Sequence, residues 1–171
     1  MNKSIVRIVQ VCAVFALGLY ATFVCLGNLM DYGSNWDFVK HVLSMDTTFE
    51  GNALMWRAIT NEGVQMVAYW GIILTEAAIA VCGWVAGIKM LRNLKKGGES
   101  FERAKVVGYY AFLLGLLLWF VGFICIGSEW FAMWQSSIWN GKQTAMDITE
   151  VIVGLLIIYM LPSTHQLQAK K

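Results

Sequence analysis

Apolar residues are gathered into four long blocks, and charged residues lie almost entirely between the blocks. Ile8–Met30 and Val106–Ser128 contain no charge, Gly63–Ile88 contains only Glu76, and Val151–Thr164 is uncharged. A helix needs about 20 apolar residues to cross a hydrocarbon core of about 30 Å. The blocks lack the period-two alternation of barrel strands. The pattern therefore predicts an all-α integral membrane protein, a four-transmembrane-helix bundle with spans at about 7–29, 64–88, 106–128 and 146–163.

The links divide into two loops at one end of the bundle, 31–62 and 129–145, and one loop at the other end, 89–105. The whole chain, 1–171, is expected to form a single membrane domain. The first link is longer than a connection requires. Its apolar residues fall on one helical face, which predicts a short amphipathic helix and hence a helical cap over the bundle. The residues of that face are Phe38, Val39, Val42 and Leu43.

The placement of basic residues predicts the orientation. The chain is 58% hydrophobic and 14% charged, about half the usual charged share, and its net charge is only +2. Three basic residues, Lys40, Arg57 and Lys142, lie on the side of the two loops. The positive-inside rule therefore places both termini in the cytoplasm and the cap on the extracytoplasmic side. The basic residues flank membrane spans and give no support to nucleic-acid binding. The other ten basic residues are Lys3, Arg7, Lys89, Arg92, Lys95, Lys96, Arg103, Lys105, Lys170 and Lys171.

Small residues predict which helix faces pack closely. In the third span, Gly108, Gly115 and Gly122 are seven residues apart and share one stripe in an α-helix, and in the second span Gly83 and Gly87 are four apart. Such stripes let neighbouring backbones approach. These stripes explain how helices pack within the bundle. They could also serve the association of several copies of the chain into a homo-oligomer.

Glu76 is the sharpest polar feature, because it lies midway along the second span. A charge at the bilayer centre costs at least about 2.5–3.5 kcal/mol and should face the bundle interior. Glu76 could carry a proton, bind a cation or anchor a polar head group. It could instead be a neutral acid that is hydrogen-bonded to Thr75, Tyr109, Tyr110 or a helix carbonyl.

Glu150 is a second candidate intramembrane acid, with a simpler explanation. Asp147 and Glu150 form D-x-x-E at the expected start of the fourth helix. This spacing suits a capping box, and both charges favour a helix N-terminus.

The segment GSEWFAMWQSSIWNG, residues 127–141, joins the last two spans and is rich in tryptophan. Tryptophans on one side of a bundle usually form an interfacial belt. The acid and amides set among them also allow a pocket, to which the end of the first helix could contribute. Both readings remain open. The residues of this candidate outer pocket are Asn28, Asp31, Glu129, Trp130, Trp134, Gln135, Trp139 and Asn140.

Several functional classes lack sequence support. His41 and His165 are the only histidines and neither lies in a span, so haem ligation within the bundle is not indicated. The chain has no metalloprotease motif, phosphate-binding loop or nucleophile elbow. The four cysteines all lie within spans and imply no disulfide framework. We therefore expect no enzyme activity, no metal site and no cofactor.

Two stretches, DYGSNWDFVKHVLSMDTTFEGNALMWRAI (31–59) and the EWF-MWQS-WNG core (129–141), resemble a bacterial family of predicted small integral membrane proteins classed only as a domain of unknown function. The resemblance covers nearly the whole chain. It implies four spans and a bacterial inner (cytoplasmic) membrane, and it supplies no activity. The chain departs from the motif at Ser128, where the family form has glycine.

Three functional hypotheses follow. The first is a non-enzymatic accessory or binding protein that acts through its extracytoplasmic cap on a partner protein or lipid. The second is a small proton-coupled transporter that uses Glu76. The third is a quinone- or lipid-binding redox subunit, with Glu129, Trp130 and Trp134 as its head-group pocket. The expected partners are the lipid bilayer, another membrane protein or a second copy of the chain.

Overall fold

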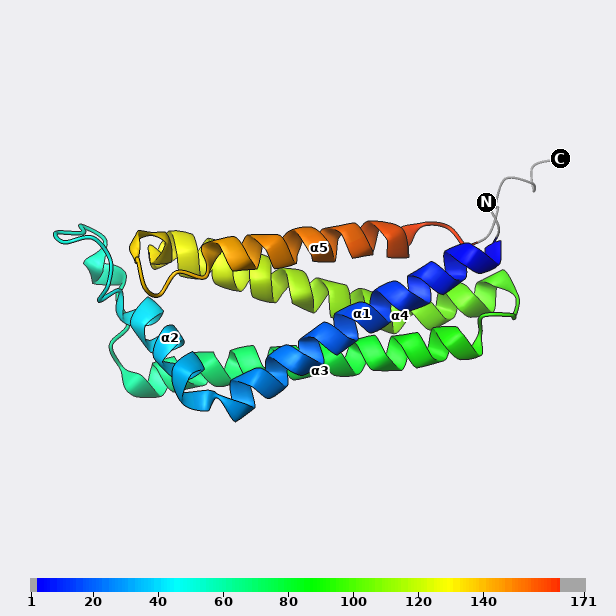
Figure 1. Cartoon of the computed structure of the whole chain (residues 1–171), viewed down its shortest axis with the longest axis horizontal. Coiled ribbons are helices and arrows are strands. Elements are labelled where there is room, and N and C mark those ends of the chain that lie inside the picture. The colour runs from blue at the N-terminus through cyan, green and yellow to red at the C-terminus, as the bar shows by residue number, and fades with distance from the viewer. Residues whose placement is uncertain (1–2, 164–171) are drawn as a thin grey trace.

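A computed structural model describes residues 3–163 of the chain (Figure 1). Lys170, Lys171 and His165 lie outside this range. The prediction of four spans is confirmed, because the described residues form four helical segments that are long and apolar enough to cross a membrane. They are α1 (Lys3–Met30), α3 (Glu62–Arg92), α4 (Gly98–Gly115) continued by η2 (Leu116–Trp130), and α5 (Lys142–Met160). Three shorter helices are α2 (Tyr32–Ser44), η1 (Met55–Arg57) and η3 (Met133–Gln135).

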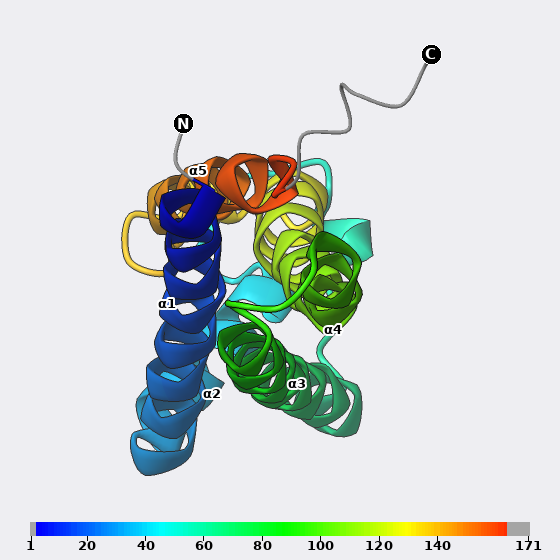
Figure 2. The ribbon, with the colours of Figure 1, turned by 90° about the vertical axis from the view of Figure 1, so that its right-hand side faces the viewer.

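Consecutive spanning helices run in opposite directions, so the links between them lie at two opposite ends of the bundle. The cap end carries residues 31–61 and 131–141, and the terminal end carries the 93–97 link and the ends of the described chain (Figure 1). Helix α1 is strongly tilted relative to the other spans. It begins beside α5 and ends away from α5, near α2 (Figure 2). Where α1 crosses α3, Gly18 faces Gly83, and a Cβ on Gly83 would lie 2.6 Å from the Gly18 Cα. The two backbones can approach this closely only because both residues are glycine.

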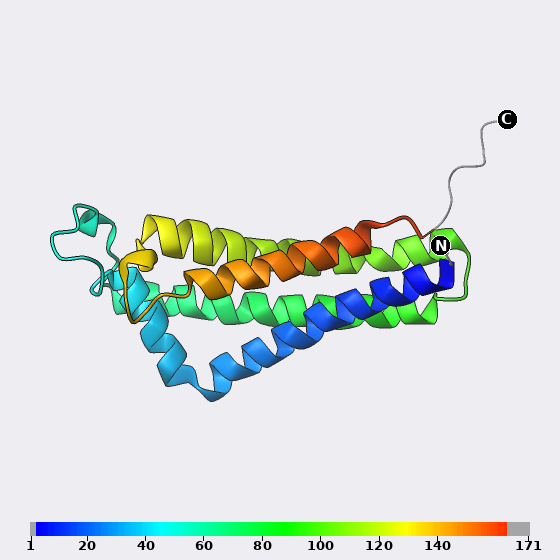
Figure 3. The ribbon, with the colours of Figure 1, turned by 45° about the horizontal axis from the view of Figure 1, so that its top comes forward.

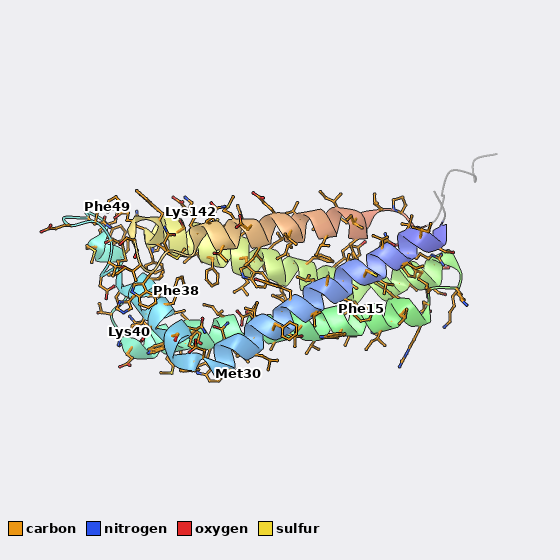
Figure 4. All side chains as sticks on the ribbon, in the orientation of Figure 1. Phe15, Met30, Phe38, Lys40, Phe49 and Lys142 are labelled. Carbon is orange, nitrogen blue, oxygen red and sulfur yellow. The ribbon has the colours of Figure 1, made fainter. Side chains whose placement is uncertain are left out.

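Helices α4 and α5 pack closely in the terminal half of the bundle. A Cβ on Gly108 would collide with the Tyr159 side chain, and one on Gly115 would lie 3.2 Å from the Cδ1 atom of Ile152. The Tyr159 hydroxyl is buried and donates a hydrogen bond to the Lys105 carbonyl (2.8 Å). On the other side of this half, Gly87 faces the ring of Phe15, which Figure 4 labels on α1.

Gly122 does not continue this stripe, which corrects the prediction of three equivalent glycines. Beyond Gly115 the span widens into a π-helix, η2, in which amides bond carbonyls five residues back. The wider turn holds about one more residue, so positions seven apart no longer share a face. A Cβ on Gly122 would meet only the Leu117 carbonyl of its own helix, at 3.6 Å.

Polar side chains hold the terminal end together. Arg7 is buried and donates to the carbonyls of Leu94 (2.9 Å) and Lys96 (2.8 Å) in the link between α3 and α4. Gln10 is fully buried and donates to the Leu161 carbonyl (2.6 Å) at the end of α5. These bonds pair main-chain carbonyls in the link and beyond the end of α5, which have no partner within a helix.

The cap end is more open. In this half α3 lies apart from η2 and α5, whereas α3 and α4 lie side by side at the terminal end (Figures 1 and 3). Helix α2 rises from the end of α1 across the beginning of α3 towards the tip of the cap end (Figure 3). It begins at Tyr32, and the Ser34 hydroxyl donates a hydrogen bond to the Asp31 carboxylate (2.9 Å).

Candidate functional site

The candidate site is built on a contact between two spans. Glu76 on α3 is only 2% exposed. The side-chain amide of Asn28, in the last turn of α1, donates to both of its carboxylate oxygens, at 2.9 and 2.8 Å. Among the described residues no lysine, arginine or histidine lies within ion-pair distance of this carboxylate. The acid is therefore held by a neutral amide.

Asn28 replaces the partners that the sequence suggested for Glu76. Thr75 donates instead to the Gly71 carbonyl of its own helix (2.7 Å). Tyr109 packs edge-on against Tyr159 in the terminal half. Asn28 was expected in the outer pocket, but its side chain contacts Glu76, which lies midway along α3.

Tyr69 fixes the position of Asn28. It is 1% exposed, one side of its ring packs edge-on against Tyr32 (5.0 Å between centroids), and its hydroxyl donates to the Asn28 main-chain carbonyl (3.0 Å). The Asn28 side-chain oxygen lies 3.4 Å from the same hydroxyl. Tyr69, Asn28 and Glu76 thus form a continuous hydrogen-bonded row that joins α1 to α3.

This row borders a cavity of about 400 Å³, which we call the Glu76 cavity. Asn35, Asn140 and Thr144 line its polar mouth, where Asn140 and Thr144 are exposed and Asn35 is half-buried. Its wall also includes the exposed Tyr20 and the buried Trp119, whose rings pack together at 5.5 Å between centroids. The remaining lining comes from Val24, Asn28, Phe38, Val39, Tyr69, Ile72, Glu76, Phe123, Gly141, Ala145 and Ile148.

A second cavity, of about 470 Å³, lies back to back with the first and is called here the apolar cavity. Phe38 and Val39 of α2, Ile72 of α3 and Phe123 of η2 line both cavities. Phe38, labelled in Figure 4, stacks on Phe123 with 6.3 Å between ring centroids. The rest of the lining is almost wholly apolar: Val42, Leu43, Ala68, Gly71, Thr75, Leu114, Leu117, Leu118, Gly122, Ile126, Gly127, Phe131 and Met133.

The paired cavities combine polar groups with hydrocarbon surface. The Glu76 cavity offers hydrogen-bond acceptors, amides and aromatic faces, and the apolar cavity offers hydrocarbon contact. The described residues contain no cluster of three or more histidine, cysteine, aspartate or glutamate side chains that could hold a metal ion. Ligand sites are typically concave and mostly apolar, with a few placed polar groups and volumes of about 300–1,000 Å³. Both cavities fit this description.

The residues of the predicted outer pocket are divided by the structure. Asn28 and Asn140 line the Glu76 cavity. Glu129 is exposed and pairs with Lys142 (2.9 Å). Asp31 is also exposed.

The remaining members of that predicted pocket hold the cap together. Trp130 packs edge-on against Trp56, and the Arg57 guanidinium lies 4.3 Å from the Trp130 ring centroid. Other contacts join residues 131–141 to the 44–61 segment and to α2. The Trp134 ring packs against Phe49, and the Trp139 ring stacks on His41. The Gln135 side-chain oxygen accepts hydrogen bonds from the Phe49 main-chain amide (3.2 Å) and the Asn52 side chain (3.1 Å).

Glu150 lies apart from Glu76. Helix α5 begins at Lys142, five residues before Asp147, so Asp147 and Glu150 do not form its first turn. Asp147 accepts a hydrogen bond from Gln143 (2.7 Å), and Glu150 is exposed on the outer face of the helix. The capping explanation is therefore corrected, since the helix starts earlier than the apolar block does.

Sequence reasoning missed the residues that shape the cavities, namely Tyr20, Tyr69, Phe38, Ile72 and Phe123. All five sit in apolar blocks or on an apolar face, where nothing distinguishes them from core residues. A signal was present for the polar pair, because Asn28 and Glu76 are isolated polar residues within neighbouring spans, and such residues tend to pair.

Comparison with known proteins identifies the family. A family model described as "Predicted small integral membrane protein (DUF2165)" matches residues 6–162, which is most of the chain. No curated protein and no solved structure matches the chain. The chain, with its four apolar spanning helices, therefore belongs to this family of predicted small integral membrane proteins.

Proposed function

We propose that this protein is a non-enzymatic binding protein of the bacterial inner membrane that holds an amphipathic, lipid-like molecule. The polar end of the ligand lies against Glu76 and Asn28, and its tail lies in the apolar cavity. The observation that carries this proposal is a buried carboxylate in one cavity, which shares a wall with a second cavity that is almost wholly apolar.

The position of the cavities supports a ligand drawn from the membrane. The apolar cavity is lined in part by Leu117 and Ile126, which are both 47% exposed on η2. The cavity therefore reaches the surface between α3 and η2, where lipid surrounds a spanning helix. An acyl or prenyl tail can enter there without crossing water.

The cap fits the same role. Helix α2 supplies Phe38 and Val39 to both cavities, and the 131–141 segment supplies Asn140 and Gly141 to the Glu76 cavity. With both termini in the cytoplasm, as the basic residues predict, the cap covers the site on the extracytoplasmic side. Its exposed surface then remains available for a partner protein.

The close packing of the terminal half favours holding a ligand over transporting it. Gly18 lies against Gly83, and Gly108 against Tyr159, at this half of the bundle. A proton-coupled transporter needs access to its acid from both sides in turn, and these glycine contacts leave little freedom for the helices to separate. The binding role therefore ranks ahead of transport.

The test is the identity and amount of lipid that copurifies. The protein is extracted from membranes in mild detergent, and its bound molecules are measured by organic extraction and mass spectrometry. Ile72→Trp places an indole in the wall that both cavities share, and Leu74→Trp places the same indole on a 63% exposed, outward-facing position of the same helix. Thermal unfolding checks that both variants fold.

We expect about one molecule per chain with the wild-type protein and with Leu74→Trp, and a clear loss with Ile72→Trp. A copurifying quinone would identify the ligand as a redox carrier and favour the redox-subunit hypothesis within the same site. Equal lipid content in all three proteins would count against the proposal.

A further inference from the structure

We infer that the Glu76 cavity recognises an organic ammonium group, so that the ligand is a cationic amphiphile. This inference rests on the proposed function, since it names the chemical class of the head group that the paired cavities would hold.

The first argument is the missing positive charge. The Glu76 carboxylate is 2% exposed and lies in the middle of a spanning helix. Its only hydrogen-bonding partner among the described residues is the neutral Asn28 amide. A buried charge without a counter-charge is costly in a membrane. An ammonium group in the cavity supplies that counter-charge.

The second argument is the aromatic wall. Tyr20, Tyr69 and Trp119 line the same cavity as Glu76. Tyrosine and tryptophan rings attract cations through the negative charge of their faces, and aromatic cages of this kind recognise ammonium groups. An acid set among aromatic rings suits an organic cation better than it suits a carboxylate or phosphate.

The third argument concerns the rival cations. Calcium takes six to eight oxygen ligands, and magnesium requires near-octahedral oxygen coordination. The Glu76 cavity contains one carboxylate, and its nearest amide presents an N–H group to that carboxylate. An alkylammonium needs only an acceptor for its N–H bonds and a hydrocarbon surface for its tail. The adjoining apolar cavity provides that surface.

The test compares three probes that share one tail: octylamine, octanol and octanoate. Each is titrated against the protein in phosphatidylglycerol nanodiscs, and binding to empty nanodiscs is subtracted. For the wild-type protein we expect octylamine to bind at least about tenfold more tightly than octanol, since coupling of close buried charges exceeds about 1.4 kcal/mol. Octanoate should bind most weakly, because its charge repels Glu76.

Glu76→Gln is the decisive variant, because it keeps the side-chain size and an acceptor for Asn28 but removes the charge. The preference for octylamine over octanol should then disappear, while octanol binding stays within about twofold. Ile72→Trp should weaken all three probes, and Leu74→Trp should weaken none.

The outcomes separate this inference from the proposed function. If the three probes bind equally to the wild-type protein and Ile72→Trp weakens them all, the cavities bind amphiphiles but the ammonium class is wrong. If no probe binds, the proposed function itself fails. Two further octylamine titrations identify the source, in phosphatidylglycerol nanodiscs that carry equal shares of either phosphatidylethanolamine or uncharged diacylglycerol and so have the same surface charge. Weaker octylamine binding in the phosphatidylethanolamine discs points to a lipid head group, and equal binding points to a free amphiphilic amine.

Discussion

The side-chain amide of Asn28 donates hydrogen bonds to both carboxylate oxygens of Glu76, although the two residues are 48 positions apart and belong to different spans. The pair joins the end of the tilted helix α1 to the middle of α3. It fixes the acid against one side of the Glu76 cavity and leaves the rest of that cavity free for a ligand. In the proposed binding role, stability and ligand recognition therefore depend on the same contact.

Breaking this pair should destabilise the protein more than removing it altogether. Asn28→Leu leaves the buried carboxylate of Glu76 without its donor, and we expect a loss of about 1–3 kcal/mol in the free energy of unfolding. The double variant Asn28→Leu/Glu76→Met replaces both partners with apolar groups and should recover most of that loss. SDS titration in detergent micelles measures both. A double variant that is as unstable as the sum of its single variants would show that the two residues are not coupled.

The glycine contact between α1 and α3 should tolerate no side chain. Gly83→Ala places a Cβ 2.6 Å from the Gly18 Cα, and overpacking of this kind costs about 1–3 kcal/mol. Gly71→Ala is the matched control on the same helix, because nothing lies within 4 Å of its added Cβ. That control should be neutral or stabilise the protein by up to about 1 kcal/mol. Equal melting temperatures for the two variants would mean that the helices do not cross at Gly83.

Ser128 offers a gain in stability. Its side chain is fully buried in η2, and its hydroxyl has no hydrogen-bonding partner among the described residues. Ser128→Ala removes the unpaired hydroxyl and should raise the free energy of unfolding by about 1 kcal/mol. Ser137→Ala, at an exposed position of the cap, should change it by less than about 0.5 kcal/mol. A lower melting temperature for Ser128→Ala would indicate that the hydroxyl makes a bond in the membrane.

The orientation of the bundle can be tested by cysteine labelling. In a background without Cys12, Cys25, Cys82 and Cys125, single cysteines are introduced at Ser137 in the cap and at Gly97 in the link between α3 and α4. A membrane-impermeant maleimide should label Ser137→Cys in intact spheroplasts and Gly97→Cys only after the membrane is opened. The reverse pattern would contradict the orientation predicted from the basic residues.

The four spans could be predicted from the sequence because the length of an apolar block alone decides whether a helix can cross a bilayer. The pairing of Asn28 with Glu76 could not be predicted from the sequence, since it depends on the tilt of α1. Counting residues along each block places Asn28 at the membrane surface and Glu76 at its centre. Helix α1 is tilted where it crosses α3 at Gly18 and Gly83 (Figure 2), and the Asn28 side chain reaches Glu76 beyond this crossing.

The cavities depend on features that helical periodicity does not reveal. Arguments from residues seven apart assume an α-helix, and they fail beyond Gly115 because η2 has π-helical hydrogen bonding. Phe38 was correctly placed on the apolar face of α2, but only the path of α2 across the cap end shows that it lies against Phe123. The tryptophan-rich segment was a visible signal, and most of its side chains serve to close the cap.

The most direct test of the ligand-binding account is an experimental structure of the protein in lipid particles taken from its own membrane. The account predicts continuous density that begins between Glu76 and Trp119, passes the shared wall at Ile72 and Phe123, and extends into the apolar cavity. Cavities that hold only water, or that are closed by the collapse of α2 onto η2, would contradict it.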